Sequence, residues 1–339
     1  MRAPLGGVKA QPTHNGEIAL VQSVKPRRTK ALAIAAFTAA CTIASSTLAG
    51  SARTRDVIPS NAQGYQSSAL WLWQETVITD PSAEATFFAF VGTHGVRRVY
   101  VECESAIQTN QPALIRFLEA AASHGMVTEL LFGDPRWVLP GKGYPHQGYA
   151  VSLVATFTKR LLRRMNAGKP VAVHFDVEPY SLARWRRERN AIALDYIGLV
   201  TRLAGAAHSL GLTLSVDVPY WYSTIPVTRG SVTTPMNQLV IDAVDGYVIM
   251  DYWDTSQRVA SQATTDLTYA DGRGKDVVIG VLTTCGQIPA DTSFCNATSH
   301  SGTAWMESVL RVVTEIERPH SSFTGAAIED YAGFSTLGR

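Results

Sequence analysis

The segment "VAVHFDVEPY", Val171 to Tyr180, alternates apolar and ionisable residues with a period of two. In a β-strand successive side chains point to opposite faces, so one face is apolar and the other carries His174, Asp176 and Glu178. Pro179 lacks the N–H that a sheet needs and marks the end of the strand. We therefore expect both carboxylates at the C-terminal end of a strand, where α/β folds place their chemistry; a structural ion-pair network is the alternative.

Strand-like runs of this kind alternate with helical patterns along the chain. The strands are expected at 68–74, 97–104, 127–134, 170–178, 212–221, 245–253, 276–284 and 325–334, and the clearest helices at 81–95, 111–125, 150–168, 181–211 and 303–317. Eight strands separated by helices predict an α/β protein with a (β/α)₈ TIM barrel. An open doubly wound sheet is the alternative, but no Gly-rich phosphate turn follows an early strand. Few residues follow position 334, so either the barrel lacks its last helix or the assignment is shifted by one element.

The composition is that of an ordinary globular protein. The 339 residues are 46% hydrophobic and 17% charged, with a formal net charge of +2. No clustered basic face is interleaved with aromatic residues, so we expect no nucleic-acid partner.

The first fifty residues resemble an export signal. The basic segment "KPRRTK" at 25–30 precedes an apolar Ala-rich run that ends in small residues, with cleavage expected near Ala49 or Ala52. The expected organisation is an N-terminal extension and signal peptide at 1–50, a linker at 51–66 and a barrel domain at 67–339. The mature protein is expected to be secreted or periplasmic, without stable membrane association. A lipoprotein at Cys41 and an uncleaved anchor helix are the less favoured alternatives, because Thr stands three residues before Cys41 and the apolar run is only just long enough to span.

Export permits disulfides. Cys285 and Cys295 share the loop segment "CGQIPADTSFC" and are the expected pair, while Cys103 lies on the apolar face of its strand and is expected to be a buried free thiol. No Cys/His spacing indicates a zinc site, and we expect neither a metal nor another cofactor.

Carboxylates and aromatic residues gather at the expected C-terminal ends of the strands. Alternation directs Trp71 and Trp73 inward on the first strand, Glu102 and Glu104 on the second and Asp217 on the fifth. Further carboxylates at corresponding heights are Asp134, Asp251, Asp254, Glu329 and Asp330, and further aromatic residues are Trp137, Tyr180, Tyr220, Trp221, Tyr222, Tyr252, Trp253 and Tyr331. Flat rings beside carboxylates suit the apolar C–H faces and hydroxyl rims of sugars, so the set favours a carbohydrate ligand. Two carboxylates flanking a glycosidic bond are what its hydrolysis requires.

The segment "FDVEPY" resembles the end of the fourth-strand motif D-x-x-D-x-D-x-E of the chitinase-like family-18 glycoside hydrolases. The resemblance implies that Glu178 is the general acid/base and that Asp176 orients the N-acetyl group of the substrate, which acts as nucleophile. "VIMDYWD" is similar to the family's M-x-Y-D on the sixth strand and implies that Tyr252 contacts the reacting sugar. The order of the strands agrees over most of residues 67–334.

The sequence departs from that family at four positions. Val171 and His174 stand where the motif has Asp, Trp253 follows Tyr252 where Asp is expected, and Glu329 lies near the place of a Trp. A related family of TIM-barrel glycosidases therefore fits as well. In that case Glu329 or Asp251 would act opposite Glu178 as nucleophile or base.

We expect an exported, monomeric glycoside hydrolase whose partner is a carbohydrate substrate. The glycan, its anomer and the stereochemical outcome are left open. The side chains expected to contact substrate are Trp71, Trp73, Glu102, Glu104, Asp134, Trp137, His174, Tyr180, Asp217, Tyr220, Trp221, Asp251, Trp253 and Glu329. One alternative is a metal-dependent hydrolase that uses His174, Asp176, Glu178 and Asp217, although paired-His spacing is lacking. The other is a non-catalytic sugar-binding barrel.

Overall fold

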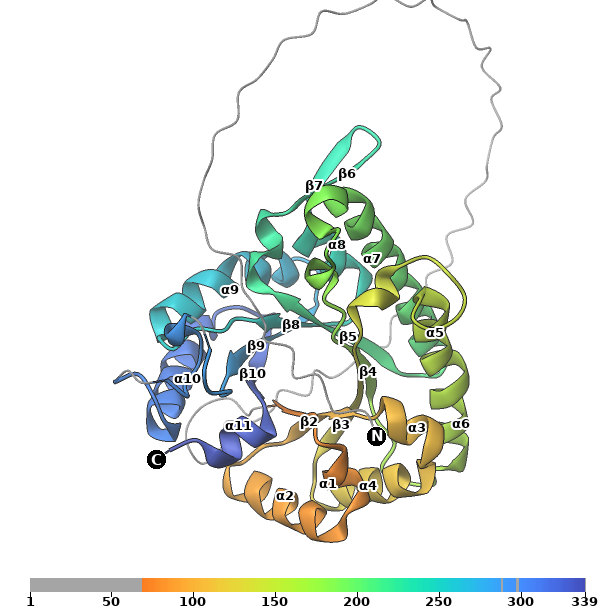
Figure 1. Ribbon diagram of the computed structural model, residues 1–339. Helices are drawn as coiled ribbons and strands as arrows, with labels where there is room; N and C mark the ends of the chain where they lie inside the picture. Colours follow the sequence, from red (N-terminus) through yellow and green to blue (C-terminus); the bar gives the residue numbers. More distant parts are fainter. Residues whose placement is uncertain (1–68, 288, 297–298, 339) are drawn as a thin grey trace, which may run out of the picture. The chain divides into compact units, whose positions relative to one another are not determined.

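The computed structural model describes residues 69–287, 289–296 and 299–338, and its centre is a closed barrel of eight parallel strands (Figure 1). Around the barrel the strands follow one another in the order β1-β10-β9-β8-β5-β4-β3-β2. They are Ala69–Leu72 (β1), Arg98–Glu102 (β2), Val127–Phe132 (β3), Ala172–Phe175 (β4), Thr213–Pro219 (β5), Gly246–Met250 (β8), Asp276–Leu282 (β9) and Phe323–Glu329 (β10). All eight expected strands are present, which confirms the α/β, (β/α)₈ fold.

The α-helices surround the barrel, as Figure 1 shows. They are Glu75–Thr79 (α1), Pro81–Thr93 (α2), Glu104–Thr109 (α3), Gln111–Ser123 (α4), Gln147–Ser152 (α5), Lys159–Arg164 (α6), Trp185–His208 (α7), Met236–Ala243 (α8), Ser256–Asp271 (α9), Thr303–Glu317 (α10) and Tyr331–Thr336 (α11). Shorter helical segments are Pro135–Val138 (η1), Leu153–Thr158 (η2, π-helical), Pro179–Ser181 (η3), Tyr220–Thr224 (η4) and Ala290–Thr292 (η5). Four glycines expected to end helices have positive φ, which a residue without Cβ adopts at little cost: Gly95, Gly125, Gly168 and Gly211.

Strand alternation divides the core into two parts. Outward side chains such as Val99, Val173 and Leu214 are fully buried against the helices. A smaller cluster fills the barrel interior and includes Trp71 and Tyr100. The expected inward and outward faces of β1, β2, β4 and β5 are therefore correct.

Two features of the structure differ from expectation. The expected last strand, 325–334, ends at Glu329, because Asp330 caps the short helix α11 and accepts a hydrogen bond from the Gly333 N–H. The barrel thus has a helix after its last strand. An antiparallel hairpin, Pro226–Arg229 (β6) and Val232–Pro235 (β7), was not expected and projects outside the ring of helices in Figure 1.

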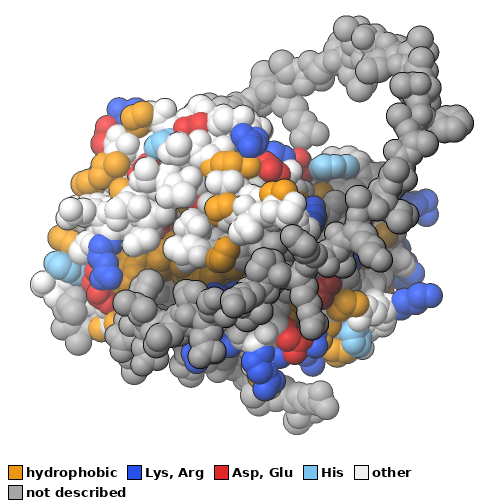
Figure 2. Space-filling model, turned by 90° about the horizontal axis from the view of Figure 1, so that it is seen from above, with side chains coloured by type: hydrophobic (Ala, Val, Ile, Leu, Met, Phe, Trp, Pro, Cys, Tyr) orange, Lys and Arg blue, Asp and Glu red, His pale blue; other side chains and the backbone are white. Residues whose placement is uncertain are grey.

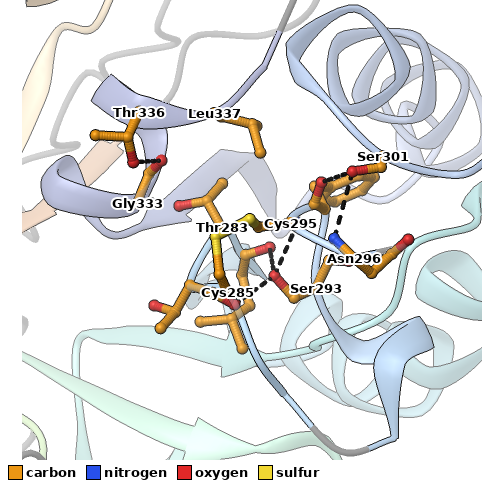
Figure 3. The surroundings of a disulfide bond; sticks show 12 residues. Thr283, Cys285, Ser293, Cys295, Asn296, Ser301, Gly333, Thr336 and Leu337 are labelled. Carbon is orange, nitrogen blue, oxygen red and sulfur yellow. Dashed lines mark hydrogen bonds between the residues drawn. A yellow bond between two sulfur atoms is a disulfide. The ribbon is translucent and has the colours of Figure 1, made fainter. Parts of the chain in front are cut away.

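The expected disulfide joins Cys285 to Cys295 and closes the loop that follows β9. Figure 3 shows this loop beside α11, where Thr283 lies next to Gly333 and Ser293 is hydrogen-bonded within the loop. Cys103 is a buried free thiol, as expected.

The predicted signal peptide, the lipoprotein alternative at Cys41, the linker at 51–66 and the first two residues of the predicted barrel domain lie outside the described residues. Within the part of the chain that the structure describes, no helix is long and apolar enough to cross a membrane. On the face shown in Figure 2, acidic and basic side chains are interspersed among hydrophobic and uncharged ones.

Candidate active site

Five inward positions meet at the C-terminal end of the barrel: Trp73, Glu102, Asp176, Tyr252 and Glu329. Each continues the inward alternation of its strand, and Asp176, Tyr252 and Glu329 are less than 10% exposed. In (β/α)₈ barrels this is the end at which side chains from different strands converge on a ligand. The structure therefore brings carboxylates and aromatic rings together from β1, β2, β4, β8 and β10.

Glu178 lies two residues beyond Asp176, where the chain turns from β4 into η3. Its side chain is half-buried, and the Tyr180 hydroxyl donates a hydrogen bond to its Oε1 atom. Pro179 starts the 3₁₀ turn, in which the Ser181 N–H donates to the Glu178 carbonyl oxygen at 3.0 Å. A tight turn begun by proline thus fixes the backbone that carries Glu178.

Gly133 sets the position of Asp176. A Cβ atom at Gly133 would lie 2.5 Å from the carbonyl oxygen of Asp176. The Asp176 N–H in turn donates to the Phe132 carbonyl oxygen at 2.8 Å, which extends the β3–β4 ladder by one residue. Only glycine permits the backbone at the end of β3 to approach Asp176 this closely.

Aromatic side chains form one side of this end. Tyr180 packs against Tyr252, Met250 and Leu282, and its ring meets Trp221 edge-on at 5.0 Å. Tyr180, Tyr220 and Trp221 are each partly exposed. They follow β4 and β5, so they lie beside Asp176 and Glu178 in the barrel order.

Glu102 is the last residue of β2, and Glu104, expected inward on the same strand, is instead the first residue of α3. The Glu104 N–H donates to Glu102 Oε1 at 2.9 Å, and the Tyr149 hydroxyl donates to Glu104 Oε1 at 2.8 Å. Burial raises the pKa of Glu102 to about 7; the Glu104 N–H opposes this shift, and the nearby Glu104 and Glu75 carboxylates add to it. Glu102 can therefore exchange a proton near neutral pH.

A charged network fills the interior deeper in the barrel. The ring nitrogens of His174 lie 2.9 Å from Glu129 Oε2 and 2.8 Å from Asp217 Oδ1. Arg98 donates to the other oxygen of Glu129, and the Trp71 indole N–H donates to Asp217 Oδ2 at 2.9 Å. The network therefore links side chains from five strands, β1 to β5.

The network holds its charges despite complete burial of His174. Burial disfavours the imidazolium ion, but Asp217 and Glu129 outweigh it and raise the pKa of His174 to about 10. Burial likewise opposes ionisation of Glu129, yet Arg98 and His174 lower its pKa to about 2. Both ring nitrogens of His174 are engaged by carboxylate oxygens, which argues against His174 as a metal ligand. Among the described residues, no group of three or more His, Cys, Asp or Glu side chains could hold a metal ion.

Several expected substrate contacts lie elsewhere. His174, Asp217 and Trp71 are at most 2% exposed and belong to the interior network. Trp137 is fully buried on the outer side of the barrel, against Tyr149 and Phe175. These side chains pack within or around the barrel and do not line its C-terminal end.

Asp251 and Trp253 also correct the expectation. Asp251 shares the outward parity of Ile249 and is fully buried, and burial next to Asp266 and Glu317 raises its pKa well above the usual range. Trp253 is 7% exposed and packs behind Tyr220, with the Arg258 guanidinium 3.4 Å above its ring. Both lie on the outer face because the alternation of β8 continues past its last residue, Met250.

Asp134 has a local role instead. It caps η1 and forms a doubly hydrogen-bonded ion pair with Arg136. Two other residues were missing from the expectation, Glu129 and Arg98. The alternation of "VTELLF" places Glu129 on the inward face with Leu131, so the rule that identified His174 also identifies Glu129.

Known structures share this architecture at low sequence identity. A GH39 β-xylosidase from Caulobacter crescentus is 15% identical, with a TM-score of 0.52 over 81% of this chain and 64% of that one. A GH113 β-1,4-mannanase is 13% identical with a TM-score of 0.49, covering 79% of this chain and 88% of that one. A chitinase from Chromobacterium violaceum ATCC 12472 is 16% identical with a TM-score of 0.39, covering 64% and 68%. At this identity the likeness to the β-xylosidase shows the barrel fold alone, and membership of family 18 stays a prediction.

No protein-family model matches the sequence, and no curated protein matches it.

Proposed function

We propose that this protein is a glycoside hydrolase that cleaves O-glycosidic bonds of a poly- or oligosaccharide at the C-terminal end of its barrel. The observation that carries the proposal is the convergence there of Glu178 and Asp176 with the aromatic side chains Tyr180, Trp221 and Tyr252. Carboxylates supply the acid/base chemistry of glycoside cleavage, and flat rings suit the faces of sugar units.

In this proposal Glu178 is the general acid/base and Asp176 is its helper. The Tyr180 hydroxyl, which donates to Glu178, orients the carboxyl group before the substrate arrives. Protonation of the leaving oxygen by a positioned acid contributes about 10²–10⁴ to the rate. Tyr252 would contact the reacting sugar.

Two groups are candidates for the second catalytic function, an N-acetyl group of the substrate and the Glu329 carboxylate. Glu329 is the candidate among the protein's own side chains, because it faces inward, is 7% exposed and lies at the end of β10. Asp251 is no longer a candidate, since it is buried on the outward face of the barrel, away from the inward side chains.

Release of new reducing ends from a panel of chitin, mannan, xylan and cellulose oligosaccharides tests the proposal. We expect turnover of at least one glycan that continues after exhaustive treatment with a chelator. Binding of a glycan without turnover would favour the non-catalytic sugar-binding barrel instead. Export is part of the proposal, and an N-terminus near residue 50 in secreted protein is the expected result of N-terminal sequencing.

A further inference from the structure

The loop between η1 and α5 presents an aromatic ring to solvent. Tyr144 is 58% exposed, although most large apolar side chains among the described residues are buried. This loop follows β3, so it belongs to the C-terminal face of the barrel, and Figure 1 shows it in yellow beside α5. An exposed aromatic ring on that face is available to a ligand.

Tyr144 is held in place by charged and aromatic neighbours. Arg136 hydrogen-bonds its hydroxyl at 2.5 Å and stacks its guanidinium 5.1 Å from the ring centre, while the Tyr149 ring meets it edge-on at 5.2 Å. Arg136 is itself fixed by Asp134, to which its Nε donates at 2.9 Å. The ring is thus ordered before any ligand binds, which lowers the entropic cost of binding.

The same contacts connect Tyr144 to the candidate active site. Tyr149 donates to Glu104, and the Glu104 N–H donates to the inward carboxylate Glu102. Asp134 follows directly after Gly133, whose Cα faces the backbone of Asp176. Tyr144 therefore lies on the β2–β3 side of the end at which Glu102 and Asp176 converge.

We propose that Tyr144 is a stacking platform for a sugar unit of the glycan that lies several sugar units away from the glycosidic bond that Glu178 cleaves. This inference rests on the proposed function and narrows the substrate class to chains of several pyranose units. The ring would take the C–H face of a sugar, while the Arg136 guanidinium beside it offers donors to the hydroxyl rim. The proposal places Tyr144 beyond the sugar units that a disaccharide at Glu178 would occupy.

The test compares long and short substrates in the mature chain. Y144A should lower kcat/KM on hexasaccharides of N-acetylglucosamine, mannose or xylose by about 2- to 12-fold, the value of one aromatic contact. It should leave kcat/KM on the matching disaccharide or aryl glycoside unchanged. Y144F should keep nearly wild-type values because it keeps the ring, and V232A, on the 63% exposed Val232 of the β6–β7 hairpin, is the matched control.

Three results would overturn the inference. The first is a kcat/KM of Y144A on the hexasaccharide equal to that of the wild type. The second is an equal loss of kcat/KM on short and long substrates, as a general structural defect would cause. If none of these glycans is hydrolysed, the proposed function fails, and hexasaccharide binding by calorimetry then decides the inference separately. Weaker binding in Y144A than in V232A would uphold the platform, and equal or absent binding would refute it.

Discussion

His174 carries a positive charge at the centre of the barrel, and two carboxylates depend on it. Glu129 and Asp217 are each at most 2% exposed, and each accepts a hydrogen bond from one nitrogen of the imidazolium ring. Removing one partner of a buried ion network leaves the others charged and uncompensated. His174 should therefore matter more to stability than any ion pair on the surface.

We expect His174→Leu to lower the free energy of unfolding by about 3–5 kcal/mol. The matched control is His208→Leu, because His208 pairs with Asp245 at 2.6 Å but its side chain is 51% exposed. Loss of that exposed pair should lower the free energy of unfolding by less than about 1 kcal/mol. Urea unfolding of both variants at pH 6 measures the difference, and equal losses would contradict the network's role.

The same network predicts how stability depends on pH. The pKa of His174 is raised from 6.5 to about 10, so its contribution is complete below pH 6.5 and is lost as the pH rises through 10. The pKa of Glu129 is lowered from 4.5 to about 2, so its contribution is complete above pH 4.5 and is lost as the pH falls through 2. The stability of the wild type relative to His174→Leu should thus be greatest near pH 4.5–6.5 and decline toward pH 10.

Glu102 should respond to pH in the opposite sense to an ordinary carboxylate. Its pKa is raised from 4.5 to about 7, so the folded protein binds a proton that the unfolded chain has lost, and stability falls as the pH rises from 4.5 to 7. Glu102→Gln can still accept the Glu104 N–H. Between pH 4.5 and 8 its free energy of unfolding should therefore rise by on the order of 1–3 kcal/mol relative to that of the wild type. Urea unfolding at both pH values measures this change. The same difference in free energy of unfolding between the two proteins at both pH values would contradict the raised pKa of Glu102.

Among the elements, strand alternation determined most of what the sequence could predict. It assigned both faces of β1, β2, β4 and β5 correctly, and applied to β3 and β8 it also places Glu129 inward and Asp251 outward. Asp251 is grouped with the site in the sequence analysis because it stands at the height of the other carboxylates at the expected strand ends, whichever face it lies on. The hydrogen bond between Trp71 and Asp217 crosses the barrel between non-neighbouring strands, so strand order alone could not predict it.

The close approach of β3 and β4 gives a prediction about the elements that position Asp176. Gly133→Ala would place a Cβ 2.5 Å from the Asp176 carbonyl oxygen, whereas Gly143→Ala, in the following loop, meets nothing within 4 Å. We expect Gly133→Ala to displace Asp176 and to lower kcat on a cleaved glycan by about tenfold or more, since misplacing a catalytic group by 1 Å can cost about 10²-fold. Gly143→Ala should keep wild-type kcat, and similar kcat values for both variants would contradict the positioning role of Gly133.

For the molecule as a whole, the eight-strand period predicted the closed barrel, but not what is attached to it. The β6–β7 hairpin lies inside a connection between strand and helix, where the alternating pattern of the barrel gives no signal. The sequence pattern does not reveal α11, because Asp330 continues the expected strand 325–334 although in the structure it caps this helix. The disulfide was predictable, since two cysteines in one loop of a chain with an expected export signal have few other partners.

The Cys285–Cys295 bond closes the loop between β9 and α10. Closing a loop of about eleven residues should stabilise the protein by roughly 2–3 kcal/mol. The double variant Cys285→Ser, Cys295→Ser should therefore unfold at a lower temperature and no longer respond to reducing agent, whereas the Tm of the wild type should fall on reduction. A wild-type Tm that is insensitive to full reduction of this bond would contradict the expected stabilisation.

The most direct measurement of the central claim is the turnover of Glu178→Gln on a glycan that the wild type cleaves. The replacement is isosteric and can still accept the Tyr180 hydroxyl, so the variant should fold and bind the glycan while its kcat falls by ~10²–10⁴. Glu315→Gln is the matched control, because the Glu315 side chain is 59% exposed on α10 and pairs with Arg318. Wild-type turnover by Glu178→Gln would contradict its assignment as the catalytic acid and make Glu329 the next carboxylate to replace.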